Sequence, residues 1–185
     1  MIKGGKQCYA THVADTVPVL IGLGAMLRVV GTQGEREIAL DDFYTGDGKA
    51  VHTLKADEVV AEIKIPPVTG RTRGIFIKHR LRESIDFGLL NVAVVLELVE
   101  GVCHQGRIVV SAVAPRPIRA IEAEKKLKGQ RLSQDVVEEV ANAAVKEVKP
   151  ISNSLCIGVT AGYRRKLVKA LVERALEQVI QEEPS

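Results

Sequence analysis

The sequence predicts an α+β fold in two parts, and three observations support this prediction. Several short stretches alternate apolar and polar residues with a period of two, as half-buried strands do. Stretches with apolar residues at helical spacing are gathered mainly after residue 117. The pair Pro66–Pro67, followed by the Gly-containing "VTGRTRG", marks a break between the parts. This order of elements is typical of an antiparallel sheet with segregated helices.

The first part is expected to begin with a helix over residues 16–25. Asp15 precedes this helix in the position of an N-cap, and Pro18 lies in its first turn, where proline is tolerated. The stretches "MLRVVG" and "REIAL" alternate on either side of the Gly-containing "TQGE", which predicts a β-hairpin. A helical turn over 40–44 and a strand over 59–65 complete this part.

The second part is expected to form a small antiparallel sheet followed by helices. "GIFIKHRL" predicts one strand, and "NVAVVLELVEGVCHQGRIVVSAV" predicts two more, joined by a turn between Gly101 and Gly106. Three helices are predicted after the sheet. They cover about 117–128, about 134–148 with Ser133 as N-cap, and about 160–181.

Composition and charge exclude several classes of protein. The net charge of +3, from 26 basic and 23 acidic side chains, is too small to require nucleic acid or an anionic membrane as partner. The longest apolar runs are well short of the roughly 20 residues that a membrane span needs. No signal-peptide pattern opens the sequence. We therefore expect a cytoplasmic protein that binds neither membrane nor nucleic acid.

The spacing of cysteine and histidine residues predicts neither a disulfide framework nor a metal site. Cys8, Cys103 and Cys156 are widely separated and form no CxxC pair. The four histidines show no spacing typical of metal ligands. We therefore expect no protein-derived metal centre in this chain.

Five blocks of the sequence occur in a characteristic order. They are "HVADTVPVLIGLGAMLRVVGTQGEREIALDDFYTGDG", "LKADEVVAEIKIP", "FIKHRLRESIDFGLLNVAV", "VAPRPIRAIEAEKKLKG" and "GYRRKLVKALVERALE". Together they resemble the FAD-binding medium subunit of molybdenum hydroxylases, a family that includes the flavin subunits of xanthine dehydrogenase, carbon monoxide dehydrogenase and 4-hydroxybenzoyl-CoA reductase. The resemblance covers essentially the whole chain.

The resemblance implies how the chain is divided. Residues 1–68 are similar to the C-terminal part of the family's FAD-binding domain, its second subdomain, and residues 72–185 to the family's C-terminal domain. The glycine-rich loops that hold the FAD phosphates in this family are expected upstream of Met1, supplied by a separate polypeptide or by a longer chain. Cys8 is similar to a cluster-binding cysteine of one branch, and is expected to be a remnant because one thiol cannot hold a cluster.

The resemblance also implies residues that contact the flavin from the first part of the chain. Asp15 matches an acidic residue near the ribityl chain, a role that is compatible with capping the helix. Val59 and Val60 match a strand whose backbone runs beside the isoalloxazine ring. Valines at strand spacing are also ordinary core residues, so both interpretations stay open.

Three further contacts are implied in the second part. Lys78 matches a lysine near the flavin, where a cation would favour the anionic reduced ring. It could equally be a solvated lysine on an edge strand. Asp86 and Phe87 match an acidic–apolar pair placed against the ring, although Phe87 could also be a core aromatic.

The resemblance implies an oxidoreductase component without catalytic residues of its own and not active alone. FAD would pass electrons between the iron–sulfur clusters of a small subunit and an acceptor, and the substrate would react at molybdopterin in a large subunit. A flavin-free module that docks these subunits is the alternative. The basic stretch from Arg71 to Arg82 could also contact phosphate or an acidic partner, but alternation along a strand divides it between two faces.

Overall fold

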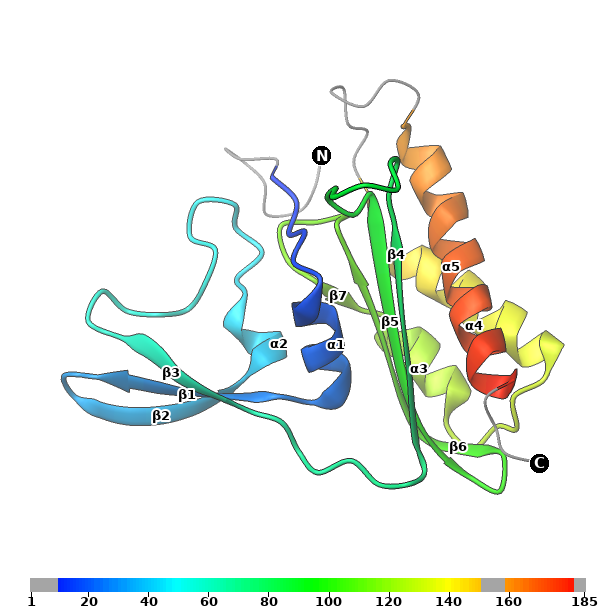
Figure 1. Ribbon diagram of the computed structural model, residues 1–185, viewed down its shortest axis with the longest axis horizontal. Helices are drawn as coiled ribbons and strands as arrows, with labels where there is room; N and C mark the ends of the chain where they lie inside the picture. The colour runs from blue at the N-terminus through cyan, green and yellow to red at the C-terminus, as the bar shows by residue number, and fades with distance from the viewer. Residues whose placement is uncertain (1–9, 151–158, 182–185) are drawn as a thin grey trace.

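A computed structural model describes residues 10–150 and 159–181 of the chain and shows two antiparallel sheets with helices (Figure 1). The first sheet has three strands in the order β2-β1-β3. The α+β prediction is confirmed, as are the helical turn and the strand near residue 60. The elements of this part are α1 (Thr16–Leu23), β1 (Met26–Gly31), β2 (Gly34–Ala39), α2 (Leu40–Phe43) and β3 (Val59–Lys64).

Helix α1 ends two residues earlier than predicted, because Gly24 adopts a left-handed conformation with φ 77°. Its N–H donates to the Ile21 carbonyl at 2.9 Å, and the Ala25 N–H donates to the Leu20 carbonyl, which satisfies the last turn. The predicted cap at the other end is wrong. Asp15 has helical backbone angles and its side chain makes no capping hydrogen bond, because the carboxylate is bound elsewhere.

The second sheet has four antiparallel strands in the order β4-β5-β6-β7. Its central hairpin turns at Glu100 and Gly101, and not over the longer segment up to Gly106 that the sequence suggested. Both turn residues have positive φ, 52° and 74°, as a tight two-residue hairpin requires. The strands are β4 (Thr72–His79), β5 (Leu90–Val99), β6 (Val102–Ser111) and β7 (Ile118–Arg119).

Three helices follow the second sheet, and the first begins four residues later than predicted, whereas the other two agree with the prediction to within one residue. Residues 117–120 were expected to open that helix, but Ile118 and Arg119 pair with β6 as the short strand β7. The Ser133 hydroxyl accepts a hydrogen bond from the Val136 N–H, which confirms the predicted cap. The helices are α3 (Ile121–Leu127), α4 (Gln134–Glu147) and α5 (Ala161–Gln181).

The four-stranded sheet is covered on both faces, as Figure 1 shows, with α3, α4 and α5 on one side and α1 on the other. The side chains of β5 explain this arrangement, because successive residues of a strand point to opposite faces of the sheet. Leu90, Val92 and Val94 pack in the core with the three helices. Ala93 belongs instead to a second core with Ile21 of α1 and residues of the first sheet. The central strands are therefore apolar on both faces.

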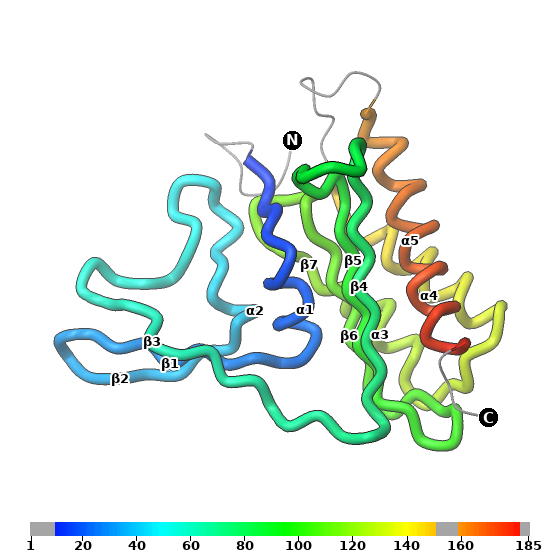
Figure 2. Tube along the Cα trace, in the orientation of Figure 1, coloured from blue at the N-terminus to red at the C-terminus, as the bar shows by residue number. Residues whose placement is uncertain are grey.

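The two sheets share this second core, so the division of the chain at 68–72 stays a prediction. Figure 2 shows the chain leaving β3 and crossing to one end of the second sheet, where it enters β4. Close packing of α1 depends on Gly22, where an added Cβ would lie 2.8 Å from Val95 Cγ2. None of the helices in the described part of the chain is both long and apolar enough to cross a membrane.

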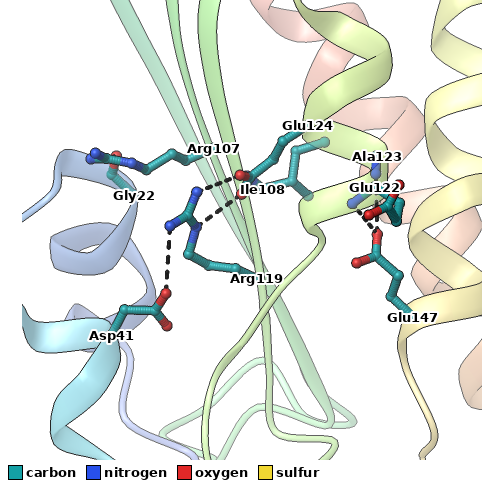
Figure 3. Close-up of polar contacts among 9 residues, drawn as sticks. All are labelled: Gly22, Asp41, Arg107, Ile108, Arg119, Glu122, Ala123, Glu124 and Glu147. Atoms are coloured by element: carbon teal, nitrogen blue, oxygen red, sulfur yellow. Dashed lines mark hydrogen bonds and ion pairs between the residues drawn. The ribbon is translucent and has the colours of Figure 1, made fainter.

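A buried carboxylate links the two parts of the molecule (Figure 3). Glu124 on α3, which is 8% exposed, accepts a hydrogen bond from the Ile108 N–H at 3.0 Å and from Arg119 Nε at 3.1 Å. Arg119 also reaches Asp41 of α2 at 3.5 Å. The buried Glu124 carboxylate needs a positively charged partner, and Arg119 of β7 is that partner. Since Arg119 also contacts Asp41, it holds α2, β7 and α3 together. The neighbouring Arg107 donates to the Gly22 carbonyl of α1 at 3.3 Å.

Replacing Arg119 by Met is expected to lower the free energy of unfolding by about 3 kcal/mol, because it leaves Glu124 charged and poorly paired. Urea unfolding at pH 7 measures this change. Lys125→Met is the matched control, since Lys125 forms an exposed pair with Glu122 and is expected to change stability little. The double variant Arg119→Met/Glu124→Gln should recover part of the loss. Equal effects of Arg119→Met and Lys125→Met would contradict this account.

Glu58 is expected to make stability depend on pH in the acid range. Hydrogen bonds from Arg36 lower the pKa of Glu58 from 4.5 to about 2. Its contribution is therefore present above about pH 4.5 and is lost as the pH falls toward 2. Glu58→Gln and Arg36→Gln should both flatten the slope of unfolding free energy in this window. A slope identical to that of the parent chain in both variants would show that the pair does not act in this way.

Candidate functional site

The candidate site is a cluster of polar side chains where α1 meets the second sheet. The Lys78 ammonium donates to Asp15 Oδ2 at 2.7 Å, and the Asn91 amide donates to Asp15 Oδ1 at 3.3 Å. Lys78 and Asn91 are direct partners in the register of β4 and β5, so both side chains lie on the face that α1 covers. The structure thus brings together Asp15 and Lys78, which lie 63 residues apart in the chain.

The backbone around His12 positions Asp15. The His12 N–H donates to the Ala114 carbonyl at 2.9 Å, and the Ala112 N–H donates to the His12 carbonyl at 2.9 Å. The Ser111 hydroxyl donates to the same carbonyl at 2.8 Å. These bonds tie the chain before α1 to the end of β6, so the start of the helix stands over Asn91. Burial lowers the pKa of His12, which keeps its ring neutral at pH 7.

Asn91 is fully buried and has a structural role that the sequence analysis missed. Its Oδ1 has no hydrogen-bond partner within the part of the chain that the structure describes. Gly88 makes room for this amide, because an added Cβ would lie 2.0 Å from Asn91 Oδ1. A polar residue at the start of the apolar run "NVAVVLEL" was the signal that could have identified Asn91.

The loop after β4 presents the second group of predicted residues. Arg82 binds both oxygens of Asp86 at 3.1 Å, and Asp86 Oδ1 accepts from the Phe87 N–H at 2.9 Å. The hydrogen bonds from Arg82 lower the pKa of Asp86. This arrangement turns two apolar side chains to solvent, since Ile85 is 98% and Phe87 is 75% exposed. Phe87 is therefore not a core aromatic of this chain.

Val59 and Val60 lie apart from this cluster, on the outer strand β3 of the other sheet. Val60 pairs with Val29 and Val59 with Val30, so the two valines point to opposite faces. Val59 is 62% exposed and Val60 is 36% exposed. Neither is a buried core residue, and the structure places neither beside Lys78.

Two arginines, Arg119 and Arg164, hold the fold together. Arg119 forms the ion pairs described above, and the buried Arg164 donates to the Ala112 carbonyl at 2.9 Å. Burial raises the pKa of Cys103 to about 11, so this thiol stays protonated. No group of three His, Cys, Asp or Glu residues within 10–150 and 159–181 is arranged to hold a metal ion. Cys8 and Cys156 lie outside the described residues.

Comparison with protein families accounts for almost the whole chain. Residues 3–68 match the family model described as the FAD binding domain in molybdopterin dehydrogenase. Residues 76–179 match the model described as the CO dehydrogenase flavoprotein C-terminal domain. The first match ends just after the Pro66–Pro67 pair, and the second begins at residue 76.

Individual proteins show the same relationship. The chain is 32% identical over 173 residues to the nicotine 6-hydroxylase medium subunit of Paenarthrobacter nicotinovorans, covering 94% of this chain and 58% of that protein. It is 30% identical to the carbon monoxide dehydrogenase medium chain of Afipia carboxidovorans, covering 95% of this chain and 59% of that protein. The chain thus spans less than two thirds of the length of these relatives.

Solved structures agree with this relationship. Carbon monoxide dehydrogenase from Hydrogenophaga pseudoflava superimposes with a TM-score of 0.82 and 26% identity, over 90% of this chain and 56% of that one. Quinoline 2-oxidoreductase from Pseudomonas putida 86 gives a TM-score of 0.79 and 26% identity, over 94% and 58%. Since the flavoprotein model alone matches more than half of its residues, the chain belongs to the family of FAD-binding medium subunits of molybdenum hydroxylases.

Proposed function

We propose that this chain is the flavin-binding electron-transfer part of a molybdopterin-containing hydroxylase or dehydrogenase complex. FAD would pass electrons between iron–sulfur clusters of a small subunit and an external acceptor, and the organic substrate would react at molybdopterin in a large subunit. The match of residues 3–68 to an FAD-binding model supports this proposal. So do the relatives whose names identify them as medium subunits.

One observation favours a flavin contact on this chain. The exposed Ile85 and Phe87 lie in the loop between β4, which holds Lys78, and β5, and Lys78 is paired with Asp15. Apolar side chains this exposed contribute nothing to the core of the chain itself and fit a flat apolar ligand or a partner surface. The Asp15 side chain remains 46% exposed, so its oxygens can accept further hydrogen bonds from hydroxyl groups.

The residues of this chain fit parts of FAD that differ in chemistry. Asp15 would accept hydrogen bonds from the ribityl hydroxyls, and Phe87 would pack against the ring with Asp86 beside it. Lys78 would place a positive charge where negative charge is added on reduction. Val59 and Val60 would offer the backbone of β3 to the ring. The flavin supplies the redox chemistry when bound, and the protein binds it and adjusts its potential.

The outer strand β3 is the surface where we propose that the phosphate-binding half of the flavin site meets this chain. All six of its residues are exposed, and its outer edge has no neighbouring strand within the described residues. Exposed apolar residues run along this strand and continue to the break. They are Val59, Val60 and Ile63 in β3, and Ile65 and Val68 after it. An exposed apolar edge of this kind is a template for another chain segment. We propose accordingly that 1–68 completes a flavin domain and that 72–185 is a separate domain.

A flavin-free module that docks the other subunits is the second candidate function. The observation in its favour is that Asp15 and Lys78 already satisfy each other in this chain, so the pair needs no ligand. The exposed residues of β3 and of the 81–87 loop would then contact protein only. The two candidates differ in whether the complex holds flavin.

We predict that the native complex carries a flavin absorption band when it is isolated from its source cells through a tag on this chain. The band should bleach when the reducing substrate of the complex or a chemical reductant is added. The flavin and molybdopterin contents of the purified complex are measured in parallel. A complex with molybdopterin but without flavin would support the docking module. A chain that purifies with neither would contradict both candidates.

Variants of Phe87 and Lys78 in that complex are expected to have different effects. Phe87→Ala is expected to weaken FAD retention about tenfold, since a ring contact of roughly 1.4 kcal/mol is lost. Tyr163→Ala is the matched control, because Tyr163 is a partly exposed aromatic on α5 and should leave retention unchanged. Lys78→Met should lower the midpoint potential of the bound flavin. Unchanged retention and potential in both site variants would exclude the proposed contacts.

A further inference from the structure

Three arginines converge at the end of the second sheet that lies away from the candidate flavin site. Arg71 and Arg73 flank the first residue of β4, and Arg131 lies shortly before α4. All three line one open pocket of about 310 Å³. Figure 2 shows why they meet, because the segment after β3 reaches the same end of the sheet as the β5–β6 hairpin. The remaining lining residues are Gly70, Leu98, Glu100 and Gly101.

Main-chain carbonyls hold two of these guanidinium groups in place. Arg73 donates to the carbonyls of Gly70 at 2.8 Å and Thr72 at 3.0 Å. Arg131 donates to the Glu100 carbonyl at 2.6 Å and pairs through its backbone with Val102. Since a carbonyl is neutral, these bonds orient the guanidinium groups and leave their charge in place. Across the described ranges, none of the three arginines forms an ion pair with a carboxylate.

The turn residue Glu100 adds to this arrangement. It has a φ of 52°, a conformation that glycine and asparagine adopt more readily, and the bond from Arg131 to its carbonyl supports it. Its carboxylate is the one acidic group among the residues that line the pocket. Three guanidinium groups and one carboxylate give the lining a formal charge of +2.

We infer that this arginine pocket binds a phosphate group, as free phosphate or as the end of a phosphate ester. Guanidinium groups match the oxygens of phosphate with paired hydrogen bonds and keep their charge at all accessible pH values. A phosphate dianion balances the charge of the lining. The pocket volume accommodates a small anion together with water.

The arginine pocket is separate from the candidate flavin site. Arg73 lies on the face of β4 that carries Ile75 and Ile77, which pack against the helices. Lys78 lies on the opposite face, five residues further on, which is on the order of 17 Å along a strand. The inference therefore does not depend on flavin binding.

The test is thermal unfolding of the 185-residue chain with increasing inorganic phosphate at about pH 8, with sodium chloride adjusted to hold ionic strength constant. A saturable rise of the Tm is expected. Arg71→Gln/Arg73→Gln should raise the apparent Kd for phosphate at least about tenfold. Arg174→Gln, which removes one charge from the exposed face of α5, is the matched control and should leave the Kd unchanged.

Two further measurements show which ionic form of phosphate binds and whether the ligand is the free ion or an ester. The Kd for phosphate should rise several-fold at about pH 5.5, where the dianion is protonated, while the Kd for sulfate should stay constant. Glycerol phosphate binding as tightly as free phosphate indicates an ester ligand, and weaker binding indicates the free ion. Should the double variant fail to fold, Arg71→Gln alone is used, because the side chain of Arg71 makes no hydrogen bond within the described residues. No saturable rise, or an equal loss in Arg174→Gln, would overturn the inference.

Discussion

Burial of β5 and β6 on both faces is the constraint on which the rest of the structure depends. One face carries large aliphatic side chains that pack against three helices, and the other carries Ala93 and Val95 beneath α1. Small residues on that second face, with Gly22 on the helix, let α1 approach closely. The start of α1 then stands over Asn91, which brings the Asp15 carboxylate within reach of Lys78. The candidate site is thus a consequence of how the helix packs on the sheet.

The same packing explains why a buried ion pair is needed where the two sheets meet. The short strand β7 and α3 leave the Ile108 N–H without a strand partner, and the Glu124 carboxylate accepts from it. A carboxylate buried to this extent needs a cation, and Arg119 supplies it while also contacting Asp41. The two parts of the chain are therefore connected by ion pairs as well as by apolar contacts. Such a connection favours one defined orientation of the first sheet relative to the second.

Local sequence patterns predicted most of the elements but not the contacts between them. Period-two alternation and the Ser133 cap identified strands and helices correctly, because these signals depend on neighbouring residues. The strand at Ile118–Arg119 was missed because its partner is β6, and a two-residue strand has no periodicity of its own. Asp15 was assigned to a helix cap for the same reason. Its actual partner, Lys78, is distant in sequence, so only the resemblance placed both residues near one site.

The basic stretch from Arg71 to Arg82 presents a different surface at each end of β4, because its basic side chains are paired with carboxylates at one end and not at the other. At the far end of β4, Lys78 and Arg82 are each paired with a carboxylate, Asp15 and Asp86, so this end is close to neutral. At the near end, Arg71 and Arg73 line one pocket with Arg131, and in the described part of the chain no carboxylate pairs with any of the three. A neutral, partly apolar surface suits an aromatic ring or a protein partner, whereas an uncompensated arginine cluster suits an anion. The distribution of carboxylates, and not the number of basic residues, therefore decides what each end of the strand can bind.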